Sequence, residues 1–245
     1  MNKYTRRIAL SLFGSLLLSL SVYSQMPEFR MDAAPDPALR HNRLIQERTG
    51  DGVFMQVGAF KVKGSPYLFG GRTKGDLFSP EAKAYNILLS YNTYTQGIDF
   101  YSTSNPNQPL LKEPGEVDSF TIQPNIELGI NTLIKFVYGS NIGSKDKAYY
   151  QQVYAGGKYS IYKKYKSELG IVSDNYIQSD LRQFDLTLDY YYLDADKKLK
   201  KIKPNASAVI KEFKGVKDLS TVVTQDAFSV SPDDAFIKAF DYLNH

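Results

Sequence analysis

Residues 184–192 read FDLTLDYYY, the most regular alternation of apolar and polar side chains in the chain. The apolar positions stand two residues apart, at Phe184, Leu186, Leu188, Tyr190 and Tyr192, whereas Asp185, Thr187 and Asp189 lie between them. A period of two is the signature of a β-strand whose side chains point alternately to two faces. The stretch therefore predicts a strand with one buried face.

Hairpin signals flank this strand on both sides. The tetrapeptide at 193–196, LDAD, predicts a turn into a short strand at 199–203, and the run at 149–154 reaches Gly156-Gly157 and restarts at Tyr159. Further strands are predicted upstream, at 53–62, 85–94, 98–102 and 117–122, and the apolar run at 133–138 separates the two groups.

The last forty residues change period, because their apolar residues recur at intervals of three and four. Asn205 is a possible helix cap, and a second short apolar group lies at 219–223. Ser231 begins the clearest helix, since it is followed by Pro232 and by two aspartates that suit the positive end of the helix dipole. The predicted fold class is therefore mainly β with a helical C-terminal tail (α+β), built from antiparallel sheets or hairpins and three short C-terminal helices.

The N-terminus predicts export. Lys3, Arg6 and Arg7 precede an apolar stretch of about 15 residues, which is shorter than the roughly 20 residues that span a bilayer. Small residues at Val22 and Ser24 indicate cleavage after Ser24. We expect a protein that is periplasmic or secreted, with association with the outer membrane as an alternative, and no transmembrane helix after cleavage.

The expected layout has six parts. They are a signal peptide (1–24), a flexible lead-in (25–50), an N-terminal β-rich portion (51–123), a junction (124–148), a second β-rich portion (149–203) and a helical tail packed on it (204–245). Whether the two β-rich portions share one core stays open at this level.

Charge and cysteine content exclude several classes of protein. Three of the 30 basic residues and none of the 26 acidic ones precede residue 25, so the mature chain carries 27 minus 26, or +1. This balance gives no support to nucleic-acid binding, which usually requires a strongly basic face. The chain has no cysteine, which excludes disulfides, thiolate chemistry and cysteine-bound metals.

No group of residues predicts a catalytic, cofactor or metal site. The two histidines, His41 and His245, lie in the lead-in and at the last residue, where solvent exposure is expected. Asp185 and Asp189 share a strand face but lie about 13 Å apart, too far for a catalytic pair. Asp194 and Asp196 read as turn residues neutralised by neighbouring lysines, and the glycine-rich segment at 70–75 reads as a turn.

The most biased stretch runs from residue 197 to residue 217. It holds eight lysines against a single acid, Glu212: Lys197, Lys198, Lys200, Lys201, Lys203, Lys211, Lys214 and Lys217. Such a stretch can bind an anionic partner, for example lipopolysaccharide, peptidoglycan carboxylates or an acidic glycan. The alternative is a solvated hairpin tip and helix face whose charge is offset by the nearby aspartates.

Nineteen tyrosines and no tryptophan are also unusual. Since most of these tyrosines occupy alternate strand positions, packing in the core or across strands is favoured over a platform for sugars.

Several segments resemble a pattern found in uncharacterised exported proteins of Gram-negative bacteria. They are KGSPYLF at 63–69, LLSYNTYT at 88–95, YYQQVY at 149–154, YKKY at 162–165 and LKKI at 199–202. The resemblance covers most of residues 53–215, and it implies no known activity, cofactor or site residue.

These observations favour a non-enzymatic cell-envelope binding or scaffold protein whose ligand is unknown, with an envelope glycan, lipopolysaccharide or a membrane protein as partner. One alternative is a hydrolase of glycan or peptidoglycan that uses two carboxylates brought together by the fold. A second alternative is an outer-membrane-associated barrel, which the helical C-terminus disfavours.

Overall fold

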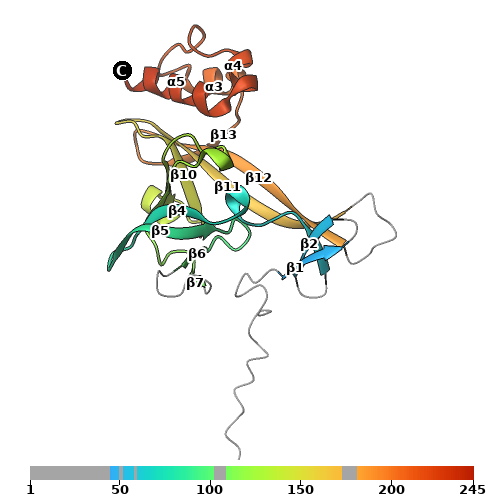
Figure 1. The fold of residues 1–245 in the computed structure, drawn as a ribbon. Coiled ribbons are helices and arrows are strands. Elements are labelled where there is room, and N and C mark those ends of the chain that lie inside the picture. Colours follow the sequence, from blue (N-terminus) through green and yellow to red (C-terminus); the bar gives the residue numbers. More distant parts are fainter. Residues whose placement is uncertain (1–44, 50–51, 58–59, 102–108, 173–180) are drawn as a thin grey trace, which may run out of the picture. The chain divides into compact units, whose positions relative to one another are not determined.

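The computed structural model describes residues 45–49, 52–57, 60–101, 109–172 and 181–245, with side chains from residue 61 onward (Figure 1). The expected signal peptide, most of the lead-in and His41 lie outside the described residues. The described part forms one unit, mainly β, with a mixed sheet and three helices near the C-terminus. The prediction of a β-rich chain with a helical tail is thus confirmed.

Within the described residues, thirteen strands form one sheet. Twelve of them follow the order β1-β2-β3-β12-β11-β10-β9-β8-β4-β5-β6-β7, and β13 pairs with β12 beside this path. The strands are β1 (Ile45–Thr49), β2 (Gly52–Val57), β3 (Phe60–Lys63), β4 (Thr73–Phe78), β5 (Lys83–Tyr91), β6 (Ile98–Tyr101), β7 (Pro109–Lys112), β8 (Ser119–Ile122), β9 (Ile134–Tyr138), β10 (Tyr149–Tyr154), β11 (Ser160–Ile171), β12 (Leu181–Leu193) and β13 (Leu199–Ile202).

The predicted alternating strand is β12, which pairs antiparallel with β11 from Arg182 to Leu193. Figure 1 shows these two long strands side by side along their length. The expectation of one fully buried face is wrong in the middle of β12. Leu186 and Leu188 are 51% and 47% exposed, although Phe184, Tyr190 and Tyr192 on the same face are buried. The ring of Tyr94 packs on Phe184, and rings of α5 pack on Tyr190 and Tyr192.

The sheet is not purely antiparallel. Residues 181–183 of β12 pair in parallel with residues 61–63 of β3, so strands from distant parts of the sequence become neighbours. β9 lies between β8 and β10 and pairs with both, so the predicted junction contributes an interior strand that joins the two β-rich portions in one sheet.

Four strands were not predicted: β1, β4, β7 and β9, the last of which the sequence showed only as an apolar run in the junction. β4 begins inside the glycine-rich segment that the sequence places in a turn. Gly70 does have the positive φ of a turn, 74°, but Gly75 lies within the sheet. A Cβ on Gly75 would stand 1.9 Å from the carbonyl oxygen of Thr121 on β8, so glycine here permits close approach of two backbones.

The sheet curls until the turn between β5 and β6 reaches β11. The backbone N–H of Ser167 donates to the carbonyl oxygen of Thr93 (3.0 Å), and the two hydroxyl groups lie 2.6 Å apart. Gln96 adds a bond from its amide to the carbonyl oxygen of Tyr165 (3.0 Å). Inside this curl lies an aromatic cluster that includes Tyr91, Phe120, Phe136 and Tyr149.

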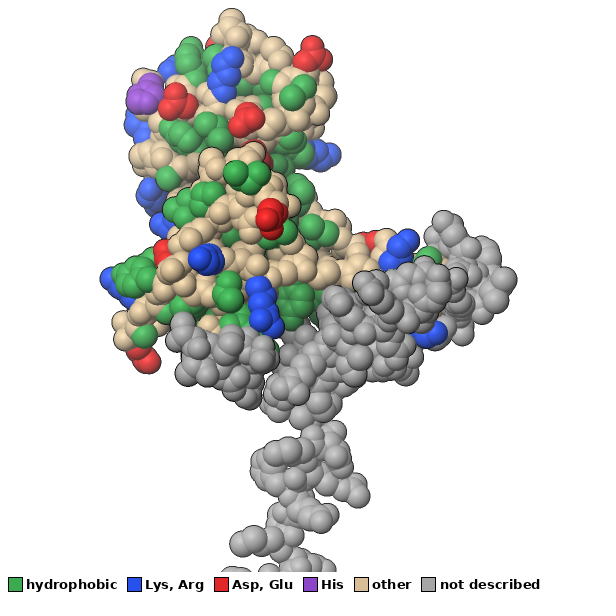
Figure 2. Space-filling model, viewed as in Figure 1, with side chains coloured by type: hydrophobic (Ala, Val, Ile, Leu, Met, Phe, Trp, Pro, Cys, Tyr) green, Lys and Arg blue, Asp and Glu red, His purple; other side chains and the backbone are tan. Residues whose placement is uncertain are grey.

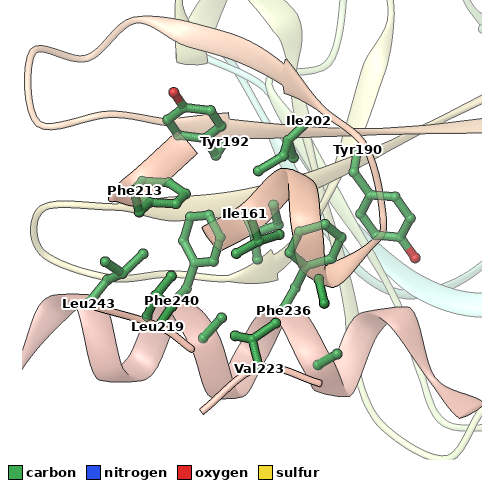
Figure 3. Close-up of a cluster of buried hydrophobic side chains, with 14 of the residues drawn as sticks. Ile161, Tyr190, Tyr192, Ile202, Phe213, Leu219, Val223, Phe236, Phe240 and Leu243 are labelled. Carbon is green, nitrogen blue, oxygen red and sulfur yellow. The ribbon is translucent and has the colours of Figure 1, made fainter. Parts of the chain in front are cut away.

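The C-terminal helices enclose a second cluster of buried apolar side chains (Figure 3). They pack it against the end of the sheet where Tyr154 of β10, Ile161 of β11 and Tyr192 of β12 lie. The helices are α3 (Ala206–Phe213), α4 (Gln225–Val230) and α5 (Pro232–Asn244). The predicted caps are confirmed, since the Asn205 and Ser231 side chains accept bonds from backbone N–H groups three residues on. The second helix was misplaced. Residues 219–223 form a turn that buries Leu219 and Val223, and α4 begins after Thr224.

A buried ion pair fixes α5 on the sheet. Lys163 on β11 is 8% exposed, and its Nζ lies 2.5 Å from a carboxylate oxygen of Asp233 in the first turn of α5. The other carboxylate oxygen accepts a bond from the Tyr190 hydroxyl group (2.5 Å). Burial alone would lower the pKa of Lys163, but Tyr165 and Asp233 outweigh it, so the pKa is raised above that of a free lysine.

We predict that Asp233→Asn lowers the free energy of unfolding by about 2 kcal/mol, because it leaves the Lys163 ammonium buried without a counter-charge. This is below the roughly 3–5 kcal/mol typical of a fully buried pair, since the Asp233 side chain is 33% exposed. Urea denaturation measures the loss.

Asp234→Asn is the matched control. It removes a carboxylate from the same first turn, but Asp234 is exposed, so a loss of about 0.5 kcal/mol or less is expected from the helix dipole. Equal losses in the two variants would show that the contact with Lys163 contributes nothing.

We also predict a loss of stability at alkaline pH. Burial raises the pKa of Tyr91, Tyr149, Tyr150 and Tyr190, so these phenols bind protons in the folded state that the unfolded chain releases above about pH 10. Stability is then fully present below about pH 10 and is lost as pH rises further, in the same direction as for Lys163. The urea midpoint should be level from about pH 7 to 9 and fall steeply above about pH 10.

The phenolate absorbance provides the check on this cause. The absorbance of the buried tyrosines should rise together with unfolding. If all nineteen tyrosines ionise while the chain keeps its native circular dichroism, burial of the phenols is not the cause of the loss of stability.

Candidate functional site

A pocket of about 190 Å³ lies where the turn between β12 and β13 meets α3. It is lined by aromatic, acidic and basic side chains: Tyr159, Tyr192, Asp194, Ala195, Asp196, Lys200, Glu212, Phe213 and Val216. The pocket is smaller than the roughly 300–1,000 Å³ that encloses a drug-sized ligand. Its size therefore suits one small ring or the end of a chain.

One wall is the turn that joins β12 to β13. Asp194 accepts a bond from the backbone N–H of Lys198 (2.8 Å) and lies 3.0 Å from the Lys200 Nζ. Lys197 adopts a positive φ of 61°, which closes the turn. The bond from Lys198 outweighs partial burial and, together with Lys200, lowers the pKa of Asp194 below its ordinary value. Asp194 is therefore ionised at neutral pH.

The opposite wall is α3. Glu212 projects from this helix and accepts a hydrogen bond from the Tyr192 hydroxyl group of β12. Burial, followed by the contact with Glu212, raises the pKa of Tyr192, so its phenol stays protonated and donates. Phe213, which is buried, packs edge-to-face against Tyr159 and Tyr192. The rings thus form an apolar floor between charged walls.

Charge around the pocket is mixed. Asp194, Asp196 and Glu212 give three negative charges, which Lys200 offsets by one. The lining is therefore net acidic, and an anionic ligand would be repelled from the pocket itself. A neutral or cationic ligand with hydrogen-bond donors fits this lining better.

The structure divides the eight predicted lysines into two groups. Four are engaged: Lys198 with Asp196 (3.9 Å), Lys200 with Asp194 (3.0 Å), Lys201 with Asp189 (2.7 Å) and Lys217 with the carbonyl oxygen of Tyr242 (2.8 Å). The other four, which are all exposed, are Lys197, Lys203, Lys211 and Lys214. Figure 2 shows basic and acidic side chains interspersed over the C-terminal helices on the face in view.

Other sequence candidates lie apart from the pocket. Asp185 and Asp189 lie on β12 away from the turn, and His245 is exposed beside Asp241 at 3.5 Å. No group of three or more histidine or acidic side chains that could hold a metal ion occurs among the described residues. In the same part of the chain, no helix is long and apolar enough to span a bilayer.

Sequence reasoning named most of the parts of this pocket but did not assemble them. Asp194 and Asp196 were assigned to a turn. Lys200 was assigned to the basic stretch, and Glu212 was noted as the single acid within that stretch. What joins them is the cap at Asn205, which turns the chain directly from β13 into α3. A hairpin followed within three residues by a capped helix was the available signal.

Comparison of the chain with protein-family models, with curated proteins and with solved structures finds no match. The resemblance to exported proteins of Gram-negative bacteria therefore stays a prediction. The function must be argued from the geometry of the pocket and from the sequence.

Proposed function

We propose that this protein is a non-enzymatic binding protein of the bacterial cell envelope, and that its pocket holds the end of an envelope glycan. The observation that carries the proposal is the lining of the pocket, where carboxylates and an ammonium group surround an aromatic floor. Sugars present hydroxyl groups at their rim and C–H groups on their ring faces, so they complement both features. Export of the chain, which its N-terminal sequence predicts, would deliver it to such glycans.

The hydrogen-bonding groups suit a neutral sugar. Ionised carboxylates accept bonds from hydroxyl groups, and bonds to charged acceptors are stronger than those between neutral groups. Lys200 can donate to a ring or hydroxyl oxygen. Tyr159, which is half-buried, offers part of its ring at the pocket, while Phe213 lies beneath it.

Binding is favoured over hydrolysis by the state of Asp194. A glycoside hydrolase needs a carboxylic acid that keeps its proton near neutral pH, and such groups have a raised pKa. The pKa of Asp194 is shifted in the opposite direction, by the backbone of Lys198 and by Lys200. Its two hydrogen bonds also hold it in the turn. An aspartate used in this way fixes the wall of the pocket and is poorly suited to donating a proton.

The exposed lysines add a second contact to the proposal. Lys203, Lys211 and Lys214 lie on or next to α3, the helix that also supplies Glu212 to the pocket. Phosphate or carboxylate groups further along a glycan would be attracted to them, and this attraction would weaken with salt.

We predict that the protein binds envelope oligosaccharides and that Glu212→Gln weakens binding about tenfold, the loss expected from replacing one charged acceptor. Titration calorimetry with purified peptidoglycan fragments and with lipopolysaccharide core oligosaccharide measures the affinity. Tyr159→Ala should weaken binding as well.

Glu127→Gln, at an exposed glutamate outside the pocket, is the matched control and should leave the affinity unchanged. Chromatography of the oligosaccharides after long incubation distinguishes binding from catalysis. Recovery of intact sugar supports a binding protein, whereas cleavage that Asp194→Asn abolishes would establish the hydrolase. Binding to neither class of oligosaccharide would refute the proposal.

A further inference from the structure

The middle of β12 has an open edge. One edge of this strand pairs with β11 from Arg182 onward, and the other edge is shared between β3 at residues 181–183 and β13 at residues 190–193. Between them, Gly64 lies beside the backbone of Phe184, and the described residues supply no strand partner for residues 185–189 on that edge. Five residues of strand span about 17 Å, and alternate residues present their backbone N–H and C=O groups outward.

Two leucines mark the same place on one face of the strand. Leu186 is 51% exposed and Leu188 is 47% exposed, yet Phe184 and Tyr190, which flank them on that face, are buried. Half-exposed leucines beside an open edge lack the neighbour that an adjacent strand would provide. A strand added there would place its own side chains against both leucines.

The opposite face carries lysines as well as acids, and among its described acidic side chains Asp185 is the one without an ion pair. Asp185 lies directly across from Glu168 on β11, an arrangement that is destabilising for like charges. Lys166 pairs with Glu168, and Lys201 pairs with Asp189. Within the described residues, Asp185 receives a hydrogen bond from Gln183 (2.9 Å) and no ion pair. A basic side chain on an incoming strand would compensate this charge.

The geometry also limits what can bind. A second copy of the chain cannot pair through its own β12, because that strand is thirteen residues long whereas the open edge has five. β3 and β13 already occupy the same lateral position at the two ends. The occupant must therefore be a short extended segment that leaves the sheet on both sides.

We propose that the open edge of β12 binds an extended segment of a partner protein by β-strand addition. The segment carries apolar side chains at two alternate positions, over Leu186 and Leu188, and a basic side chain on the other face, beside Asp185. This surface is separate from the pocket, and the proposal does not depend on glycan binding.

The test uses seven-residue peptides with valine at alternate positions and lysine, threonine or glutamate at the central position between them. Fluorescence polarisation gives their affinities for the full chain, and amide hydrogen exchange reports the edge. We expect the lysine peptide to bind at least tenfold more tightly than the glutamate peptide and to protect amides within residues 185–189.

Variants locate the contact. Leu186→Lys and Leu188→Lys should each weaken binding of the lysine peptide at least tenfold. Ile126→Lys, at an exposed apolar residue elsewhere, should leave its affinity unchanged. Asp185→Lys should reverse the preference between lysine and glutamate peptides. A peptide N-methylated along one edge should not bind, since it cannot complete the backbone ladder.

Circular dichroism of each variant separates loss of binding from loss of folding, and both leucines are exposed enough to tolerate the change. The proposal is overturned if no peptide binds at millimolar concentration, if Leu188→Lys binds as well as the unaltered chain, or if protection appears away from β12. Equal affinity for lysine and glutamate peptides would overturn the assigned charge of the partner.

Discussion

The contact between Lys163 and Asp233 decides how the C-terminal helices meet the sheet. A lysine ammonium buried at this depth requires a counter-charge, and the first turn of α5 provides the carboxylate. Tyr190 binds the same carboxylate, so two adjacent strands hold one helix start. Because a charge pair tolerates little displacement, it fixes the position of α5, and the apolar residues behind it then pack on the ends of β10–β12.

Lys163 borders two apolar clusters, because its ammonium group lies over the ring of Tyr165 in one and over the ring of Tyr190 in the other. On one side lies the aromatic cluster inside the curled sheet, and on the other lies the cluster under the helices. In the second cluster, the rings of Tyr190 and Tyr192 contact apolar neighbours while their hydroxyl groups point away from it (Figure 3). Tyrosine serves well at such a border, since it fills apolar space and still satisfies an acidic residue at its edge. This role accounts for part of the unusual tyrosine content.

Local patterns predicted local structure well. The alternation in β12, the hairpin turns and the caps at Asn205 and Ser231 are all properties of a few neighbouring residues, and each is confirmed. Most of what failed depends on distant partners. β4 is a strand because β5 and β8 enclose it, and Leu186 and Leu188 are exposed because β3 and β13 stop short of them. The pocket was missed for another reason: its walls lie close together in the sequence, but the turn after β12 and α3 were read as separate local elements.

The parallel pair of β3 and β12 has a consequence for the order of folding. Lys61 and Leu181 are neighbours in the sheet although about 120 residues separate them in sequence. Closing so long a loop costs entropy that local hairpins avoid, so β11 and β12 can form early while β3 must wait. During synthesis the N-terminal strands emerge long before their partner exists. Until β12 is complete, β3 pairs with β2 alone and its other edge has no partner, and in that interval the chain is most exposed to wrong pairing and aggregation.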